Sequence, residues 1–139
     1  MTPAAGVTAG LGVAAVVLDL CRRRVPNWLT AAGLAGGLVC AARGGWHSLG
    51  IAAVGTLVGF LILLPFHLCG AMGGGDVKLM AAFGALLGPS GILLAAGLAA
   101  VFGGLSAAAA LLRNPRTAAI PYAPAIVLGA WVSFLGGGV

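Results

Sequence analysis

Residues 75–113 read GDVKLMAAFGALLGPSGILLAAGLAAVFGGLSAAAALLR, and this stretch decides the fold. Its uncharged run, residues 79–112, would form a continuous helix about 51 Å long, whereas the hydrocarbon core of a bilayer is about 30 Å thick. Residues 88–90 are Gly-Pro-Ser, a combination that favours a turn. We therefore expect a short helix over residues 77–87 and a full-length helix over residues 91–112.

The composition excludes a water-soluble globule. Of the 139 residues, 61% are hydrophobic and 6% are charged, whereas a typical soluble domain carries about 25% charged residues. In lipid, the backbone must satisfy its own hydrogen bonds, so that helices and closed barrels are the available spanning structures. Long apolar runs without alternation favour helices. The sequence therefore predicts an all-α, polytopic membrane protein.

The rest of the chain supplies four further apolar segments, each close to the ~20 residues that cross a membrane. They cover residues 1–18, 25–42, 49–68 and 117–139. The first segment lacks the basic stretch that precedes the apolar core of a cleavable signal, so we expect it to remain as a span. Together with the divided run, this predicts a bundle of six transmembrane helices, the fourth short, in a single domain of residues 1–139.

The basic residues test this number of helices, because cytoplasmic loops are enriched in lysine and arginine. Five spans would divide the bases almost evenly between the two sides of the membrane. With six spans, Arg43 stands alone on one side, and the other side carries Arg22, Arg23, Arg24, Lys78, Arg113 and Arg116. We expect the latter side to be cytoplasmic, with both termini outside and the protein in the cytoplasmic (inner) membrane.

The net charge of +5 does not indicate a nucleic-acid partner, because the seven bases are scattered between apolar runs. They are better suited to lipid headgroups, so membrane lipid is the expected partner. The three cysteines, Cys21, Cys40 and Cys69, form no CxxC pair and define neither a disulfide framework nor a zinc site. We expect no metal and no cofactor.

The chain contains only two carboxylate side chains, Asp19 and Asp76. The predicted topology places both at cytoplasmic helix ends, where they can converge. An ionisable group at membrane depth costs several kcal/mol unless it is paired or hydrated, which makes it a candidate functional group. The simpler alternative is local ion pairing, of Asp19 with Arg22 or Arg23 and of Asp76 with Lys78.

Gly73, Gly74 and Gly75 directly precede Asp76. Residues without side chains allow another chain to approach closely, so an extended peptide can lie beside the carboxylate; the alternative is a plain glycine-rich turn. Two neighbouring carboxylates share one proton, which is the equipment of an aspartic protease. Lys78 either tunes this pair, contacts the substrate or anchors the chain at the headgroups.

Several other polar or proline positions have structural interpretations. Pro26 and Asn27 are expected to start and cap the second helix. Pro121 suits the first turn of the last helix, and Tyr122 suits an interfacial anchor. His67 is expected on the same side as the acids, where we interpret it as a structural residue.

Three motifs in order resemble those of a known family. They are Asp19 ahead of RRRVPN (residues 22–27), GGGDVKL (residues 73–79) and IPYAPA (residues 120–125). These segments resemble the signatures of the type IV prepilin peptidases, which are GxGD intramembrane aspartyl proteases. The resemblance extends over nearly the whole chain, and it implies that Asp19 and Asp76 are the catalytic pair, supported by Gly73, Gly74, Gly75 and Lys78.

The resemblance also implies a function. It predicts an intramembrane aspartic endopeptidase that removes the basic leader peptide from type IV pilin-like precursors at the cytoplasmic membrane face. The chain lacks the paired CxxC insertion of bifunctional members, so it looks like the short Flp/Tad-pilus or archaeal preflagellin peptidases, and methylation is not expected. Two alternatives are a small proton- or cation-coupled transporter that uses the same two aspartates and a non-enzymatic membrane assembly subunit. The oligomeric state stays open.

Overall fold

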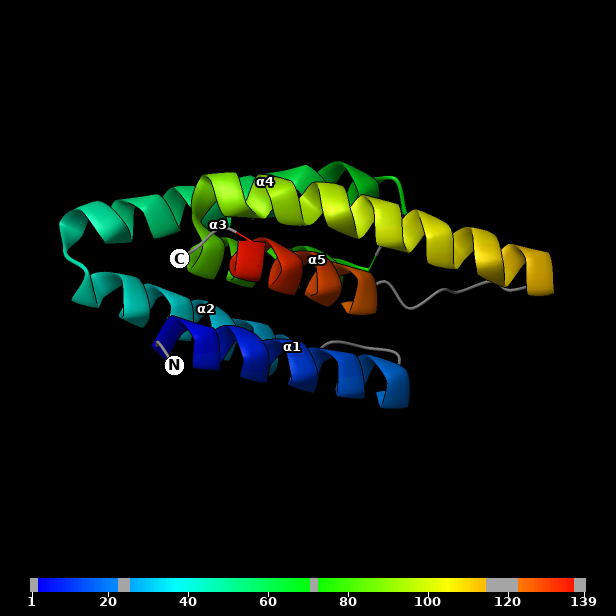
Figure 1. The fold of residues 1–139 in the computed structure, drawn as a ribbon, viewed down its shortest axis with the longest axis horizontal. Coiled ribbons are helices and arrows are strands. Elements are labelled where there is room, and N and C mark those ends of the chain that lie inside the picture. Colours follow the sequence, from blue (N-terminus) through cyan, green and yellow to red (C-terminus); the bar gives the residue numbers. More distant parts are fainter. Residues whose placement is uncertain (1–2, 23–25, 71–72, 115–122, 137–139) are drawn as a thin grey trace.

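The structure, a computed structural model, describes residues 3–22, 26–70, 73–114 and 123–136, and its regular elements there are all helices (Figure 1). They are α1 (Pro3–Arg22), α2 (Asn27–Arg43), α3 (Trp46–Leu68), α4 (Gly74–Arg113) and α5 (Ala123–Gly136). This confirms the predicted all-α class.

Three of these helices are long and apolar enough to cross a membrane, judged by length and composition. The segments are Ala5–Arg22, Trp46–Leu68 and Gly74–Arg113; α5 contains a shorter apolar helix, Pro124–Gly136. Large apolar side chains also cover the outside of the bundle, with Leu105 64% exposed and Leu135 81% exposed. Exposing this much apolar surface to water is unfavourable, whereas contact with lipid removes that cost. The surface therefore suits a lipid environment.

Helix α4 is broken at Gly88, whose backbone has φ 74° and ψ 177°. Glycine adopts this left-handed φ at little cost because it has no Cβ. Pro89 follows at the start of the next turn, where its missing N–H is not needed. Gly88 therefore divides α4 into a first half (residues 74–87) and a second half (residues 89–113).

The contacts between helices show the direction in which each one runs. Helices α1 and α2 are antiparallel, because Leu11 contacts Gly33 and Val7 contacts Gly36. Helices α1 and α5 are antiparallel too, with Thr8 against Trp131 and Gly12 against Val127. The second half of α4 and α5 form a third antiparallel pair, with Gly91 against Ser133 and Ala95 against Gly129. The first half of α4 runs parallel to α2, because Lys78 contacts Asn27 and Ala85 contacts Gly37. The two halves of α4 are therefore antiparallel, and the chain reverses at Gly88.

The prediction of six separate helices is not confirmed, because the described residues form five, α1 to α5. The predicted break at residues 88–90 is nevertheless present, with Gly88 as the one residue outside helical geometry within α4. A single glycine with a left-handed φ reverses the chain without a loop, so α4 consists of two helical halves that meet directly at Gly88. The first half also begins at Gly74, three residues earlier than predicted.

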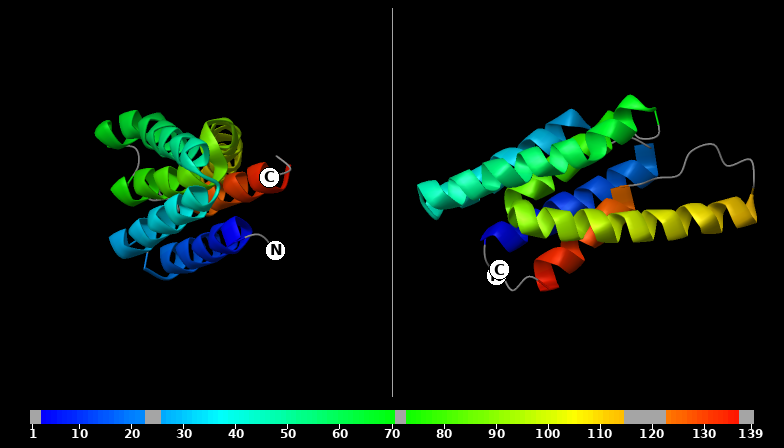
Figure 2. Two further views of the ribbon diagram at one scale, coloured as in Figure 1. Left: turned by 90° about the vertical axis from the view of Figure 1, so that its left-hand side faces the viewer. Right: turned by 90° about the horizontal axis from the view of Figure 1, so that it is seen from above.

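The reversal places the first half of α4 at the centre of the bundle. Every residue from 79 to 85 is buried, and Leu79, Met80 and Phe83 are fully so. Figure 2 (left) shows this half between α3 and α2, with the second half and α5 on its other side. The second half projects beyond the other helices (Figure 2, right).

Glycines bring α3 and the first half of α4 into backbone contact. Gly55 and Gly59 are four residues apart on α3, a spacing that suits close helix approach in lipid. A Cβ at Gly59 would stand 2.6 Å from the carbonyl oxygen of Met80, and a Cβ at Gly55 or Gly84 would overlap the facing backbone. These positions therefore require glycine.

One end of the bundle, which we call the acid end, carries the helix ends that lie near Asp19 and Asp76. There α1, α3 and the second half of α4 finish, and α2, α5 and the first half of α4 begin, opposite the turn between α2 and α3 (Figure 1). Of the described bases, Arg22, Lys78 and Arg113 lie at the acid end, and Arg43 lies at the opposite end, as predicted. Arg23, Arg24 and Arg116 lie outside the described residues.

The glycine contact predicts a difference between two Gly→Ala variants. Gly55→Ala forces α3 away from α4 and should lower the free energy of unfolding by about 1–3 kcal/mol. Gly97→Ala, at a helical position with no heavy atom within 4 Å of its added Cβ, should leave it unchanged or raise it. Thermal unfolding in detergent measures both. Equal effects of the two substitutions would contradict the close contact.

Candidate active site

The two carboxylates lie together at the acid end. Asp19 is in the last turns of α1 and 7% exposed, and Asp76 is partly buried in the first turn of α4. They are close enough for the charge of Asp19 to act on Asp76. The predicted convergence of the only two acids of the chain is therefore present in the fold.

The glycine turn holds Asp76 at the start of α4. Gly73 stands before the helix in extended geometry, with φ −72° and ψ 149°, and its carbonyl accepts a hydrogen bond from the Asp76 N–H at 3.2 Å. A Cβ at Gly73 would lie 4.0 Å from Oδ2 of Asp76. The backbone of Gly73 thus faces the carboxylate, and the absence of a side chain leaves one side of Asp76 open.

His67 lies against the same turn, which the sequence interpretation did not assign to the site. A Cβ at Gly74 would stand 3.3 Å from Cε1 and 3.6 Å from Nε2 of the imidazole. The predicted topology already placed His67 on the same side of the membrane as the acids, and this was the one feature of the sequence that pointed to its position near the site. Its proximity to Gly74 depends on how α3 ends, which spacing alone does not specify.

Lys78 is tied to α2. Its ammonium donates a hydrogen bond to Oδ1 of Asn27 at 3.0 Å. Because successive helical residues are about 100° apart, Lys78 and Asp76 point to nearly opposite sides of α4. The simple alternative of an Asp76–Lys78 ion pair therefore does not describe this lysine.

The predicted cap of α2 is partly wrong. Pro26 occupies the position before the helix, with φ −70° and ψ 145°, as expected. No side chain caps the helix. The side-chain oxygen Oδ1 of Asn27 accepts a hydrogen bond from Lys78, and the backbone carbonyl of Asn27 accepts one from the Thr30 hydroxyl at 2.9 Å. The Asn27 side chain is bound instead by a lysine 51 residues further along the chain, which a local pattern does not reveal.

No three His, Cys, Asp or Glu side chains are grouped as metal ligands within the part of the chain that the structure describes. Cys21 and Cys69 are exposed, Cys40 is partly buried, and all three are free thiols. Pro121 and Tyr122 lie outside the described residues, so their predicted roles stay predictions.

Comparison with known proteins identifies relatives of the chain. Residues 6–108 match the type IV leader peptidase family. The chain is 37% identical over 155 aligned residues to a prepilin leader peptidase/N-methyltransferase of Aeromonas salmonicida (strain A449), with 99% of this chain and 52% of the relative covered. It is 37% identical over 136 residues to the protein of the same name in Aeromonas hydrophila, covering 90% of this chain and 46% of that protein.

A more distant relative of the same name from Bacillus subtilis (strain 168) is 36% identical over 88 residues, covering 60% of this chain and 36% of the relative. The chain thus spans about half the length of the Aeromonas relatives. No solved structure shows significant similarity to it. The family match covers most of the chain, including both acids and the glycine turn, and the chain therefore belongs to the type IV leader peptidase family.

Proposed function

We propose that the chain is an intramembrane aspartic endopeptidase that removes the leader peptide from pilin-like precursors, with Asp19 and Asp76 as the catalytic pair. The observation that carries the proposal is the meeting of the only two acids at one end of an apolar bundle, where one carboxylate senses the charge of the other. Membership in the leader peptidase family supports it, and so do relatives named prepilin leader peptidases.

The proposed reaction needs only these two groups and water. Two carboxylates that repel each other hold one proton between them over a wide pH range. The ionised carboxylate takes a proton from water as the water oxygen attacks the scissile carbonyl carbon. The protonated carboxyl donates its proton to the carbonyl oxygen, which gives a tetrahedral gem-diol. The C–N bond then breaks as the amine takes a proton from one carboxyl and a gem-diol hydroxyl returns a proton to the other, so the pair ends with one proton and the new terminus is a carboxyl group.

Gly73, Gly74 and Gly75 serve this reaction by leaving room for the substrate. A peptide must reach the carboxylates in extended form, and glycine backbone permits an approach that side chains would block. Lys78 belongs to the same end of the bundle, where it supports the site through Asn27.

The proposed location is the cytoplasmic membrane, with the acid end facing the cytoplasm. Arg22, Lys78 and Arg113 lie at the acid end and Arg43 at the other, the distribution expected when the acid end is inside. The chain would then cross the membrane six times, with the halves of α4 counted separately.

A transporter that uses the same two aspartates is less well supported. A carrier exposes its ion site to both faces in turn, whereas Asp19 and Asp76 both lie at the acid end. Membership in a peptidase family gives no support to transport either.

The catalytic pair predicts that Asp19→Asn and Asp76→Asn each lower kcat/KM for cleavage of a pilin-like precursor in liposomes by about 10²–10⁴-fold, because each removes one partner of the acid–base pair. Arg43→Gln, a charge change at the opposite end, should retain the wild-type rate. Helical content and thermal unfolding establish that all three variants are folded. Cleavage at wild-type rate by either asparagine variant would exclude an aspartic mechanism.

The orientation predicts which thiols react from each side of the membrane. With Cys21 as the only cysteine, a membrane-impermeant maleimide should label inverted vesicles and spare intact cells, because Cys21 is exposed at the acid end. With His47→Cys as the only cysteine, at the opposite end, the pattern should be reversed. Labelling of Cys21 in intact cells would place the acid end outside.

A further inference from the structure

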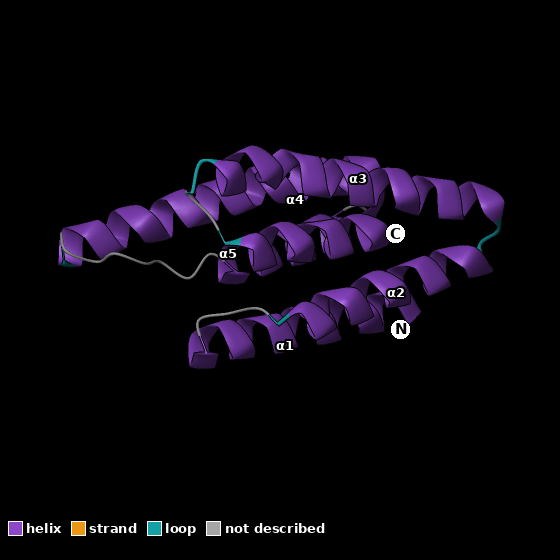
Figure 3. Ribbon diagram, turned by 180° about the vertical axis from the view of Figure 1, so that it is seen from behind, coloured by secondary structure: helices purple, strands orange, loops and turns teal. Residues whose placement is uncertain are grey.

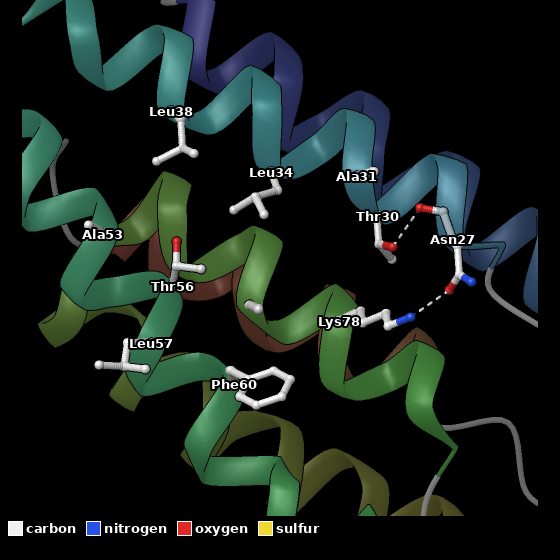
Figure 4. Close-up of a pocket in the computed structure, with 11 residues that line it drawn as sticks. Asn27, Thr30, Ala31, Leu34, Leu38, Ala53, Thr56, Leu57, Phe60 and Lys78 are labelled. Carbon is white, nitrogen blue, oxygen red and sulfur yellow. Dashed lines mark hydrogen bonds between the residues drawn. The ribbon is translucent and has the colours of Figure 1, made fainter.

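An apolar groove lies between α2 and α3, with the first half of α4 as its floor (Figure 4). It has a volume of about 790 Å³. Leu34 and Leu38 form the α2 wall, and Leu57 and Phe60 form the α3 wall. None of the interactions proposed for Asp19 and Asp76 uses this groove.

We infer that this groove binds the apolar helix that lies on the mature side of the scissile bond in the precursor. The inference rests on the proposed peptidase function and adds the site that holds the substrate during the reaction. A peptidase that cuts beside an apolar helix needs an apolar surface that begins near its carboxylates. The groove begins at the same end of the bundle as the carboxylates, because Lys78 at its end and Asp76 both lie in the first two turns of α4, on opposite sides of the helix.

The groove opens toward the acid end. Helices α2 and α3 are joined by the short turn at Gly44 and Gly45 and diverge from there, as seen from the front and from behind (Figures 1 and 3). The α2 wall extends from Asn27 to Leu38, which corresponds to about 16 Å or three helical turns. A helix that starts at the acid end can therefore lie along it for three turns.

The floor and inner edges of the groove are made of small residues. Ala31, Ala53 and Ala81 come from α2, α3 and α4, respectively, between the bulkier leucine and phenylalanine side chains. Small residues let helix backbones approach closely in lipid, where dispersion replaces the hydrophobic drive for association. Small residues at the floor between bulky walls leave room for the row of side chains along one face of a bound helix.

The polar end of the groove fits the short segment of the mature chain that links the scissile bond to that helix. An ammonium has three N–H donors, and the hydrogen bond of Lys78 to Asn27 uses one of them. The others can bind carbonyl oxygens of an extended peptide. Since Asp76 points to the far side of α4, this peptide reaches the carboxylates by crossing the turn at Gly73–Gly75, where no side chain obstructs it.

The charge of Lys78 favours one orientation of the precursor in the groove. Lys78 is the one charged side chain among the described residues that line the groove. Its positive charge repels a basic leader and leaves the uncharged apolar segment as the part that enters. The leader is thereby kept on the other side of the scissile bond.

The test uses a synthetic precursor with a basic leader and an apolar helix of about 20 residues, in proteoliposomes with the full chain. Ala53→Leu fills the groove at an exposed position; it should raise KM about tenfold and leave kcat within about twofold, because it removes binding and not chemistry. Ala100→Leu, exposed on the second half of α4 and outside the groove, should leave both constants unchanged.

Photocrosslinking locates the substrate independently of turnover. In the Asp76→Asn background, a benzophenone amino acid in place of Leu57 should crosslink to the apolar helix of the precursor. The same group in place of Leu105, a leucine 64% exposed outside the groove, should not. Excess unlabelled precursor should suppress the Leu57 product.

The outcomes separate the two proposals. If the unmodified chain cleaves the precursor, Ala53→Leu leaves KM unchanged and Leu57 crosslinks to phospholipid alone, the groove is a lipid site and the inference is overturned while the peptidase function stands. If the unmodified chain does not cleave, the proposed function fails, and the inference fails with it.

Discussion

Repulsion between the carboxylates of Asp19 and Asp76 is the interaction on which the proposed chemistry of this bundle depends. Two like charges in an apolar surrounding are unfavourable, and sharing one proton relieves the repulsion. In the proposed reaction, this arrangement provides an acid and a base side by side. Because the chain holds no other side-chain carboxylate, nothing else in it can supply this pair.

The fold brings the two acids together through close packing of glycines. Backbone contact of Gly55 and Gly59 with the first half of α4 buries that half at the centre, and Gly88 returns the chain so that the second half covers it. Asp76 therefore begins a helix that neighbouring helices enclose. The groove between α2 and α3 follows from the same arrangement, since its floor is the central half of α4.

Much of this was predictable from the sequence, because in lipid the length of an apolar run and the position of its charges carry strong information. The break near Gly88 follows from a run too long for one crossing, and the gathering of Asp19 and Asp76 follows from the number of helices and the sidedness of the bases. The prediction of six separate helices is not confirmed, because the two halves of α4 meet directly at Gly88 without a loop.

Features that depend on contacts between distant segments were not predictable. The Lys78–Asn27 hydrogen bond joins residues 51 positions apart, and the placement of His67 on Gly74 depends on how α3 ends. The groove likewise depends on the angle between α2 and α3. Local sequence patterns for caps and turns do not specify these contacts, because they involve residues on different helices.

The sharing of a proton is measured most directly by infrared spectroscopy of the carboxyl C=O stretch during a pH titration in liposomes. The chain has only two Asp and Glu side chains, so the side-chain signal belongs to Asp19 and Asp76 alone. A coupled pair should protonate in two well-separated steps, and Asp19→Asn or Asp76→Asn should each leave a single step at an intermediate pH. Two carboxyls that protonate together, with the remaining one unaffected by removal of its partner, would show that they act independently and would contradict the shared proton.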